Sequence, residues 1–494
     1  MITWGISANS HNAAVAVFSN DRLVFASETE RWSGVKNDPH LDANLHYYLH
    51  TKSLTPSNVV WYEKPLLKTL RQLEAGQGFK FKENNIRRYI KNRIFSFLPV
   101  SYVSHHHAHA AAGYYTSKFN DACVLVIDAI GEYETLTIWR GNGNKLTKEY
   151  SLDYPNSLGL WYSAMTQRVG LKPNEDEYIL MGMAAYGDPK RFFNKILLDF
   201  FQLPNDDYNH IFRLKQNVHR GCKDWAPELT TEQDMFDIAA ATQAVYETVF
   251  ERILQYALQL VPSRNLVFMG GCALNCSANP IAYKYFDNMW IMPAPGDSGS
   301  AIGAVLAKIG KHIEWKGPYL GYDMGSRHNN NNILNELLTN GICGVARGPA
   351  EFGPRALGNR SLLADPRSLK IKEQVNDIKQ RQQFRPFAPA ILAELSHHYF
   401  DIPGNGSSPY MQVVARCRDP ELFPAIVHAD GSSRVQTVSK IDNPEFYELL
   451  VMWYKATGCP MLLNTSLNIK GKPMVNDRDD CDEWEKTYGV RIFS

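Results

Sequence analysis

The stretch Cys123-Val124-Leu125-Val126-Ile127-Asp128 decides the interpretation of the fold, because it is an apolar run that ends on a carboxylate. Its β-branched residues are typical of a buried strand. Further strands are predicted at residues 135–139 and 146–150, separated by a Gly-Asn-Gly-Asn turn at 141–144. The segment therefore predicts an antiparallel meander of three strands.

The same pattern opens the chain, with apolar strands predicted at residues 2–6, 13–18 and 23–26 and a turn at Asn20-Asp21. A repeated meander predicts an α/β fold with two related lobes around a cleft, the layout of the actin-like and sugar-kinase superfamily. Chance similarity of two hairpins is the alternative. Aligning the copies places Ser7 opposite Asp128 and His11 opposite Glu132, so His11 is expected to face the cleft.

Helices are predicted at residues 41–54, 80–93, 236–260 and 301–309, with a buried strand at 266–269. The helix at 80–93 is basic, and its face is interpreted as solvated, with a nucleic-acid or substrate patch as the alternative. The pattern breaks at Trp315-Lys316-Gly317-Pro318 and at Asn329–Asn332. We therefore predict a boundary between about 313 and 335, with domains at 1–315 and 330–494.

Composition and charge restrict the class of protein. A chain of 494 residues is longer than a single hydrophobic core usually supports, so more than one domain is expected. A content of 44% hydrophobic and 21% charged residues is typical of globular proteins. The net charge of +1 gives the whole molecule no attraction to nucleic acid or anionic membrane, so neither is expected as a partner. With no signal peptide or long apolar run, the expected location is cytoplasmic. Cys272 and Cys276 are predicted to be buried thiols rather than zinc ligands or a disulfide.

A cluster of histidines marks the predicted site. Four of them lie within Ser104-His105-His106-His107-Ala108-His109, and a helix would place His105 and His109 one turn apart on one face. Asp128 at the strand end and Asp297 at a helix start are the predicted carboxylate ligands, although helix capping would also explain Asp297. Two imidazoles and two carboxylates suit a divalent metal, Fe(II) first, with Mn and Zn as alternatives.

These motifs closely resemble the NodU/CmcH family of O-carbamoyltransferases. Besides the histidine segment, the resemblance covers the following stretches in family order: Asn156–Leu160, Pro173–Glu175, Met181–Gly187, Gly270–Cys276, Glu351–Ser361, Phe384–Pro389, Asp430–Val438 and Asn464–Asn468. It implies an N-terminal domain similar to the threonylcarbamoyl-transferase branch of the actin-like superfamily and an α+β YrdC-like C-terminal domain. Such enzymes form carbamoyl-adenylate from carbamoyl phosphate and ATP, with Mg, and transfer the carbamoyl group to a small-molecule hydroxyl.

By motif position, the resemblance implies the roles of individual residues. His105, His109, Asp128 and Asp297 would be the metal ligands. Arg355, Lys379 and Arg385 would bind carbamoyl phosphate, with Arg355 and Lys379 also catalytic, and guanidinium forks suit phosphate oxygens. Arg434 and Ser466 would hold the nucleotide phosphate, and Gly271 and Asn275 are further cofactor-binding positions. His11 is predicted to polarise the substrate or act as a base.

The chain departs from the family pattern at three places. It has Asn12 after His11, Asn37 in place of a histidine after Lys36, and Ile179 in place of a lysine. Because of these changes, the sequence does not identify the molecule that accepts the carbamoyl group. A tRNA-modifying transferase of the threonylcarbamoyl type is one competing function, and a non-catalytic actin-like nucleotide-binding protein is another.

Overall fold

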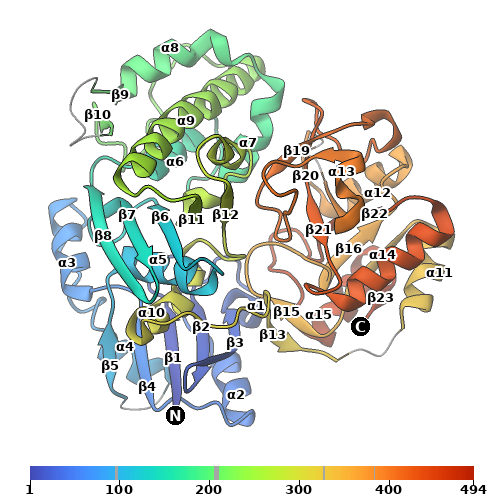
Figure 1. Ribbon diagram of the computed structural model, residues 1–494, viewed down its shortest axis with the longest axis horizontal. Coiled ribbons are helices and arrows are strands. Elements are labelled where there is room, and N and C mark those ends of the chain that lie inside the picture. Colours follow the sequence, from blue (N-terminus) through green and yellow to red (C-terminus); the bar gives the residue numbers. More distant parts are fainter. Residues whose placement is uncertain (95–97, 205–210, 326–328, 383, 386) are drawn as a thin grey trace.

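Two sheets of the same topology form the N-terminal part of the protein in the computed structural model, which describes residues 1–94, 98–204, 211–325, 329–382, 384–385 and 387–494 (Figure 1). The first sheet has the order β3-β2-β1-β4-β5 and the second the order β8-β7-β6-β11-β12. In each sheet the first three strands are antiparallel and the last two are parallel. The first sheet comprises β1 (Ile2–Ser7), β2 (Ala14–Ser19), β3 (Arg22–Glu28), β4 (Asn58–Trp61) and β5 (Val100–Tyr102). The second comprises β6 (Asp121–Ile127), β7 (Glu134–Asn142), β8 (Lys145–Asp153), β11 (Asn265–Met269) and β12 (Asn288–Trp290). The predicted α/β class and the predicted pair of meanders are confirmed.

Two helices, α5 (His105–Thr116) and α10 (Ser300–Ile309), pack against each other between the sheets. Glycines allow this close approach: a Cβ at Gly5 of β1 would lie 1.8 Å from the Ala301 carbonyl oxygen, and one at Gly303 would lie 1.8 Å from that of Ala108. A Cβ at Gly113 would likewise overlap the side chains of Val267 and Met269 on β11. The histidine helix therefore packs directly against the second sheet, and against the first sheet through α10.

The outer faces of the sheets carry the remaining helices of this part. On the second sheet α9 (Glu232–Leu260) is the long central helix, surrounded by α6 (Leu158–Arg168), α7 (Glu177–Met183) and α8 (Pro189–Phe200). Apolar residues of α2 (Ala43–Thr51) and α4 (Ile86–Ile94) pack in the core of the first sheet, and the short α1 (Glu30–Ser33) follows β3. Helix α3 (Pro65–Glu74) is held instead by polar contacts of Lys68 with Glu63 and of Arg71 with Glu132. The pair β9 (Phe201–Gln202) and β10 (Arg213–Leu214) forms a separate ribbon.

One predicted helix is wrong in extent. Residues 80–85 form turns, and the basic helix begins only at Ile86. The reason lies in two adjacent asparagines: Asn84 is buried and donates to Thr69 and Gln72, whereas the Asn85 side chain accepts from the backbone N–H of Arg88. Asparagine side chains that bond locally compete with helical hydrogen bonds and set the helix start.

The C-terminal part is built on a six-stranded sheet with the order β21-β17-β22-β16-β14-β23. These strands are β14 (Ile342–Ala346), β16 (Arg360–Ala364), β17 (Ala388–Leu392), β21 (Gln436–Val438), β22 (Met461–Ser466) and β23 (Ile492–Phe493). Apolar residues of α11 (Asn330–Asn340) and α14 (Pro444–Thr457) pack in one core, and those of α12 (Leu369–Lys379) and α15 (Arg478–Tyr488) in another. The smaller elements are β13 (Tyr319–Asp323), β15 (Pro349–Glu351), α13 (Ser396–Tyr399), β18 (Phe400–Asp401), β19 (Val414–Cys417) and β20 (Ser432–Arg434). The boundaries at 1–315 and 330–494 stay a prediction, and residues 326–328 within that junction lie outside the described residues.

Hydrogen bonds join the two parts of the chain. Arg31 is buried and donates to the backbone oxygen of Gly353 at 3.2 Å, and Trp315 donates to the Tyr410 hydroxyl at 3.1 Å. The backbone N–H of Val414 donates to the Cys276 oxygen at 3.0 Å. The segment that follows β11 therefore contacts the C-terminal part directly. Cys272 and Cys276 are both free thiols, and Cys276 is buried as predicted, whereas Cys272 is only half-buried. No helix among the described residues is long and apolar enough to cross a membrane.

Glu28, at the end of β3 beside Arg31, makes stability depend on pH. Burial raises the pKa of its carboxyl from 4.5 to about 7, although the Arg31 guanidinium opposes the shift. The folded state then binds the proton more tightly than the unfolded state, so stability is complete below about pH 4.5 and falls as pH rises toward 7. Over this range the free energy of unfolding falls by an amount on the order of 3 kcal/mol. In urea unfolding, the free energy of unfolding of Glu28→Gln should change less between pH 5 and 8 than that of the parent. Identical pH profiles would contradict this.

Candidate metal centre

Four side chains predicted as metal ligands converge on one point in the structure. The Nε2 atoms of His105 and His109 lie 3.1 Å apart, and each is 3.4 Å from Oδ1 of Asp297. Oδ2 of Asp128 lies 3.0 Å from the His105 nitrogen and 3.6 Å from that of His109. Ligands about 2.1 Å from one ion are separated by roughly 3.0–3.5 Å in octahedral or tetrahedral geometry. The spacing therefore fits a group that could hold one metal ion.

Each ligand is placed by a different element. The histidines occupy the first and second turns of α5, Asp128 follows β6, and Asp297 lies in the 3-10 turn that precedes α10. The backbone N–H of Gly271 donates to Oδ1 of Asp128 at 3.0 Å and leaves Oδ2 directed at the histidines. This loop needs glycine at position 270, where φ is +90° and a Cβ would lie 2.1 Å from the Ile127 oxygen.

Glu132 fixes the start of the histidine helix. Its buried carboxylate accepts the backbone N–H of His105 at 3.1 Å and that of Lys64 at 2.7 Å. A carboxylate at a helix N-terminus stabilises the exposed N–H groups there. Burial raises the pKa of Glu132, opposed by the nearby His105. The alignment of the two meanders paired Glu132 with His11, but the contacts show Lys64 and His105 as its partners.

Electrostatics couple the four ligands strongly. Burial lowers the pKa of His105, but the carboxylates of Asp297 and Asp128 outweigh burial and leave this pKa well above its usual value. The pKa of Asp128 is held far below its usual range, since the two imidazoles outweigh the effect of burial. Protons on the imidazoles and a cation would therefore compete for the same carboxylates, so metal affinity should fall as pH falls.

A second cluster, which we call the cation cluster, contains Arg355, Lys379, Arg381, Arg385 and Arg434 and lies on the C-terminal part. Burial, together with the neighbouring Arg434 guanidinium, lowers the pKa of Arg355 to about 9. Burial and the nearby arginines hold the pKa of Lys379 well below its usual value. Among the described residues no ion pair involves Arg355, Lys379, Arg385 or Arg434. The Asp176 carboxylate is near enough to Arg385 to oppose the decrease of its pKa, but cations still outnumber carboxylates here, which is typical of an anion site.

Lys379 is the most firmly held member of the cation cluster. Its Nζ donates to the backbone oxygen of Ser466 at 2.8 Å, to the Ser466 hydroxyl at 3.1 Å and to the side-chain oxygen of Asn468. The sequence prediction named Lys379 and Ser466 but not this contact. In the motif around Arg385, Pro386 lies outside the described residues.

Two contributors to the cluster were missed from the sequence. The Tyr178 ring of α7 lies 4.7 Å below the Arg385 guanidinium, and Arg381 stacks 3.7 Å from the Phe387 ring. Tyr178 belongs to the N-terminal part, so this ring brings α7 against the cation cluster. Tyr178 is far from Arg385 in the sequence, and of the two arginines only Arg385 lies within a family motif. Nothing in the sequence therefore pointed to Tyr178 or Arg381.

Three other predicted residues lie elsewhere. His11 is exposed in the turn between β1 and β2, and no hydrogen bond or ion pair among the described residues joins it to the four ligands. Asn275 exchanges two side-chain hydrogen bonds of 3.1 Å with Gln243 of α9. Gly271 contacts Asp128, as described above, and so lies at the metal group rather than in the cation cluster. Ile179, at the position of the family lysine, is buried.

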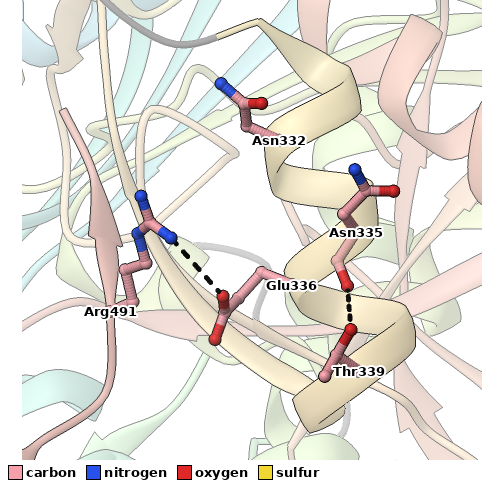
Figure 2. A pocket seen from close by; sticks show the side chains of 5 residues that line it. All are labelled: Asn332, Asn335, Glu336, Thr339 and Arg491. Carbon is pink, nitrogen blue, oxygen red and sulfur yellow. Dashed lines mark hydrogen bonds and ion pairs between the residues drawn. The ribbon is translucent and has the colours of Figure 1, made fainter.

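Two surface depressions lie away from these clusters. One, of about 350 Å³, lies on α11 and is lined by Asn332, Asn335, Glu336, Thr339 and Arg491, with Arg491 directed at Glu336 (Figure 2). Another, of about 500 Å³, lies between α1, α2 and the start of α15. Neither lining includes a predicted site residue, so the candidate site rests on the two side-chain clusters.

Comparison with known proteins places this geometry in a family. The model of the carbamoyltransferase N-terminus matches residues 3–306, and that of the carbamoyltransferase C-terminus matches residues 334–492. The chain belongs to the carbamoyltransferase family. Membership makes it one of a family of enzymes and implies a carbamoyl donor and an acceptor substrate. The predicted resemblance is thereby confirmed.

Individual relatives match half of the chain or more. An uncharacterized protein of Synechocystis is 33% identical, with 96% of this chain and 92% of that protein covered. The 3'-hydroxymethylcephem-O-carbamoyltransferase of Amycolatopsis lactamdurans is 33% identical over 97% of this chain and 95% of its own. Nodulation protein U of Rhizobium tropici is 36% identical, with 50% of this chain and 46% of that protein covered. Among solved structures, component A of (R)-2-hydroxyglutaryl-CoA dehydratase from Acidaminococcus fermentans covers 63% of this chain and 99% of its own at 12% identity and a TM-score of 0.38, too distant to support an argument.

Proposed function

We propose that this carbamoyltransferase forms carbamoyl-adenylate from carbamoyl phosphate and ATP and transfers the carbamoyl group to a hydroxyl of a small molecule. The observation that carries the proposal is the presence of two distinct clusters in one chain: a cation cluster suited to phosphates and a His-His-Asp-Asp group suited to a metal. A single transfer reaction from a stable donor would not need both.

The cation cluster would perform the first step. Arg355, Lys379 and Arg385 would bind the phosphate of carbamoyl phosphate, whose hydrolysis leaves carbamate and inorganic phosphate. A carbamate oxygen would then attack the α-phosphate of ATP, forming carbamoyl-adenylate as pyrophosphate leaves. Burial lowers the pKa of each of these half-buried cations, and a bound anion would offset that cost. Arg434 and Ser466 would hold the phosphate of the adenylate.

The His-His-Asp-Asp group would serve the second step. A divalent metal held by His105, His109, Asp128 and Asp297 would supply a Lewis acid that polarises the carbamoyl carbonyl. The residues fit such an ion, because their donor atoms have the spacing of a shared coordination sphere. The acceptor oxygen would attack the carbamoyl carbon, AMP would leave, and the acceptor proton would pass to a base. His11 stays our proposal for that base, from its turn beside β1.

The path between the clusters would run along the loop after β11. Gly271 of this loop binds Asp128, and Cys276, five residues later, contributes to the electrostatic surroundings of Arg355. The loop also contacts Val414 of the C-terminal part. An adenylate made beside Arg355 would therefore have the metal group at the other end of one continuous segment, which would limit loss of the unstable intermediate to water.

The two clusters also bear on the competing functions. A non-catalytic nucleotide-binding protein could use the cation cluster for phosphates but would not need four convergent His and Asp ligands. A tRNA-modifying transferase would need an RNA surface, and the proposed one, the basic helix, is only the nine residues of α4. We therefore propose small-molecule O-carbamoylation ahead of both.

Mass spectrometry would test the proposed function. The metal-loaded chain, carbamoyl phosphate and ATP-Mg would be incubated with hydroxyl-bearing extracts, and a product heavier by about 43 Da is expected, the exchange of hydrogen for carbamoyl in group transfer. AMP and pyrophosphate should form with it in equal amounts. Hydrolysis of ATP to ADP, or a carbamoylated product without ATP, would contradict the adenylate route.

A further inference from the structure

Helix α3 is built with its polar face inward. Lys68, Thr69 and Arg71 are its buried residues, and each is 6% exposed or less. In an ordinary surface helix the apolar stripe faces the core and charged residues face water. The reversal here is stabilised by specific partners, because Lys68 forms a buried 2.7 Å ion pair with Glu63 and Arg71 donates to the backbone oxygen of Glu132 at 3.2 Å.

The outward face of α3 is consequently apolar. Leu66, Leu67, Leu70 and Leu73 are 60%, 38%, 44% and 51% exposed, and their spacing places them on one side of the helix. Phe79 and Phe81, on the turn that follows, are 65% and 53% exposed and stack with their rings 5.9 Å apart. We call these six residues the α3 apolar face. Helix α3 lies at the outer edge of the ribbon, with no element drawn beyond it on that side (Figure 1).

Basic residues are frequent in the stretch of chain that contains this face. Between residues 64 and 94 the exposed cations are Lys64, Lys82, Arg87, Arg88, Lys91 and Arg93, and the exposed anions are Glu74 and Glu83. Six positive against two negative side chains leave a local excess of four positive charges, although the net charge of the whole chain is only +1. Charge of one sign around an apolar face complements a partner that is anionic at its surface and apolar beneath.

We propose that the α3 apolar face docks on an anionic lipid surface, with the leucines and phenylalanines entering the headgroup region and the cations of residues 64–94 facing the headgroups. Leucine and phenylalanine on one side of a helix, flanked by lysine and arginine, are the features of helices that lie in a membrane interface. Such binding is peripheral and needs no spanning helix. The expectation of no membrane partner rested on the net charge of the whole chain, which averages out this local excess.

Other partners fit the same residues less well. In a symmetric dimer through α3, each basic flank would face its own copy, and like charges would repel. RNA would bind the cations, and bases could stack on Phe79 and Phe81, but the four leucine side chains of α3 would gain no apolar partner from it. An acidic protein surface matches the charge, yet the residues that dominate protein interfaces are tryptophan, tyrosine and arginine, whereas the exposed residues of α3 are leucines.

The polar face of α3 leads toward the metal centre. Lys68 donates to the backbone oxygen of Asn9 in the turn that carries His11, and Glu132, which Arg71 contacts, binds the backbone N–H at the start of the histidine helix. Docking at α3 would therefore place the metal centre a few contacts from the lipid surface.

Vesicle co-sedimentation of the full chain tests this proposal. Vesicles of phosphatidylcholine with about one third phosphatidylglycerol should bind the chain, and pure phosphatidylcholine should bind it roughly tenfold less, because the cations need anionic headgroups. Binding should weaken as salt is raised, since screening shortens the range of exposed charges. Absence of binding to the anionic vesicles at low salt would overturn the proposal.

Two matched pairs of variants identify the surface. The variant Leu66→Ser/Leu70→Ser/Leu73→Ser should lose roughly tenfold in vesicle affinity, whereas Leu338→Ser, at a leucine 49% exposed on α11, should bind as the parent does. Arg87→Glu/Arg88→Glu should lose anionic binding, whereas Lys440→Glu/Lys455→Glu should retain it. All substituted residues are exposed, and unchanged thermal melting would confirm folding. Equal binding by all variants would overturn the assignment to α3, as would light scattering that shows a dimer dissociated by the leucine substitutions.

Discussion

Replacing Arg355 by alanine is expected to abolish the release of pyrophosphate from ATP in the presence of carbamoyl phosphate. Arg355 lies among Arg385, Arg434 and Lys379, in the cluster that we propose binds the donor phosphate. Loss of a desolvated guanidinium fork removes charge-assisted hydrogen bonds made to the phosphate as negative charge shifts, so a decrease of roughly a hundredfold or more is expected. A coupled pyrophosphate assay measures it.

A matched control separates this effect from a general loss of positive charge. Arg367 lies on the same part of the chain, pairs with Asp365 at 2.7 Å and is 40% exposed, so Arg367→Ala should release pyrophosphate at nearly the parent rate. Arg355→Lys keeps the charge but loses the fork and should fall between the two. Full activity of Arg355→Ala, with the fold intact by circular dichroism, would show that the donor binds elsewhere.

Replacing His109 by alanine is expected to divide the two steps. Pyrophosphate release should continue, because the cation cluster is on the C-terminal part, whereas formation of the carbamoylated product should stop. His109 is fully buried with its Nε2 directed at Asp128 and Asp297, so the alanine variant loses one of four ligands. Removal of a metal ligand or its support commonly costs at least about tenfold to a hundredfold in metal affinity or activity. Quenched-flow samples analysed for adenylate and product measure both steps.

The control for this substitution lies in the same run of histidines. His107 stacks on Trp139 with ring centroids 5.2 Å apart and takes no part in the four-ligand group. His107→Ala should therefore retain both pyrophosphate release and transfer within a few-fold. If His109→Ala, still folded, lost both steps together, the proposed division of labour between the two clusters would be refuted.

Local patterns in the sequence were sufficient to predict the frame of the N-terminal part. The two meanders follow from apolar alternation and from turns at Asn20 and at Gly143, both of which have positive φ. The spacing of His105 and His109 placed them on one face of a helix, and the structure brings Asp128 and Asp297 to the same point. That these residues bind a metal stays a prediction.

Features that depend on distant contacts could not be predicted in this way. The reversed polarity of α3 depends on Glu63 and Glu132, which accept its buried cations, and a pattern of leucines alone indicates the opposite orientation. The stacking of Tyr178 on Arg385 joins residues more than two hundred positions apart. His11 was expected near the site from the alignment of turns, yet a turn position does not determine where its side chain points.

Metal content is the most direct test of the central claim, that two histidines and two aspartates share one ion. The chain, its His107→Ala control and the His109→Ala and Asp297→Asn variants would be stripped, reloaded separately with Fe(II), Mn(II) or Zn(II), and analysed by plasma mass spectrometry. We predict one ion per chain in the parent and in His107→Ala, and nearly none after gel filtration in the other two. One tightly held ion per chain in His109→Ala and Asp297→Asn would contradict it.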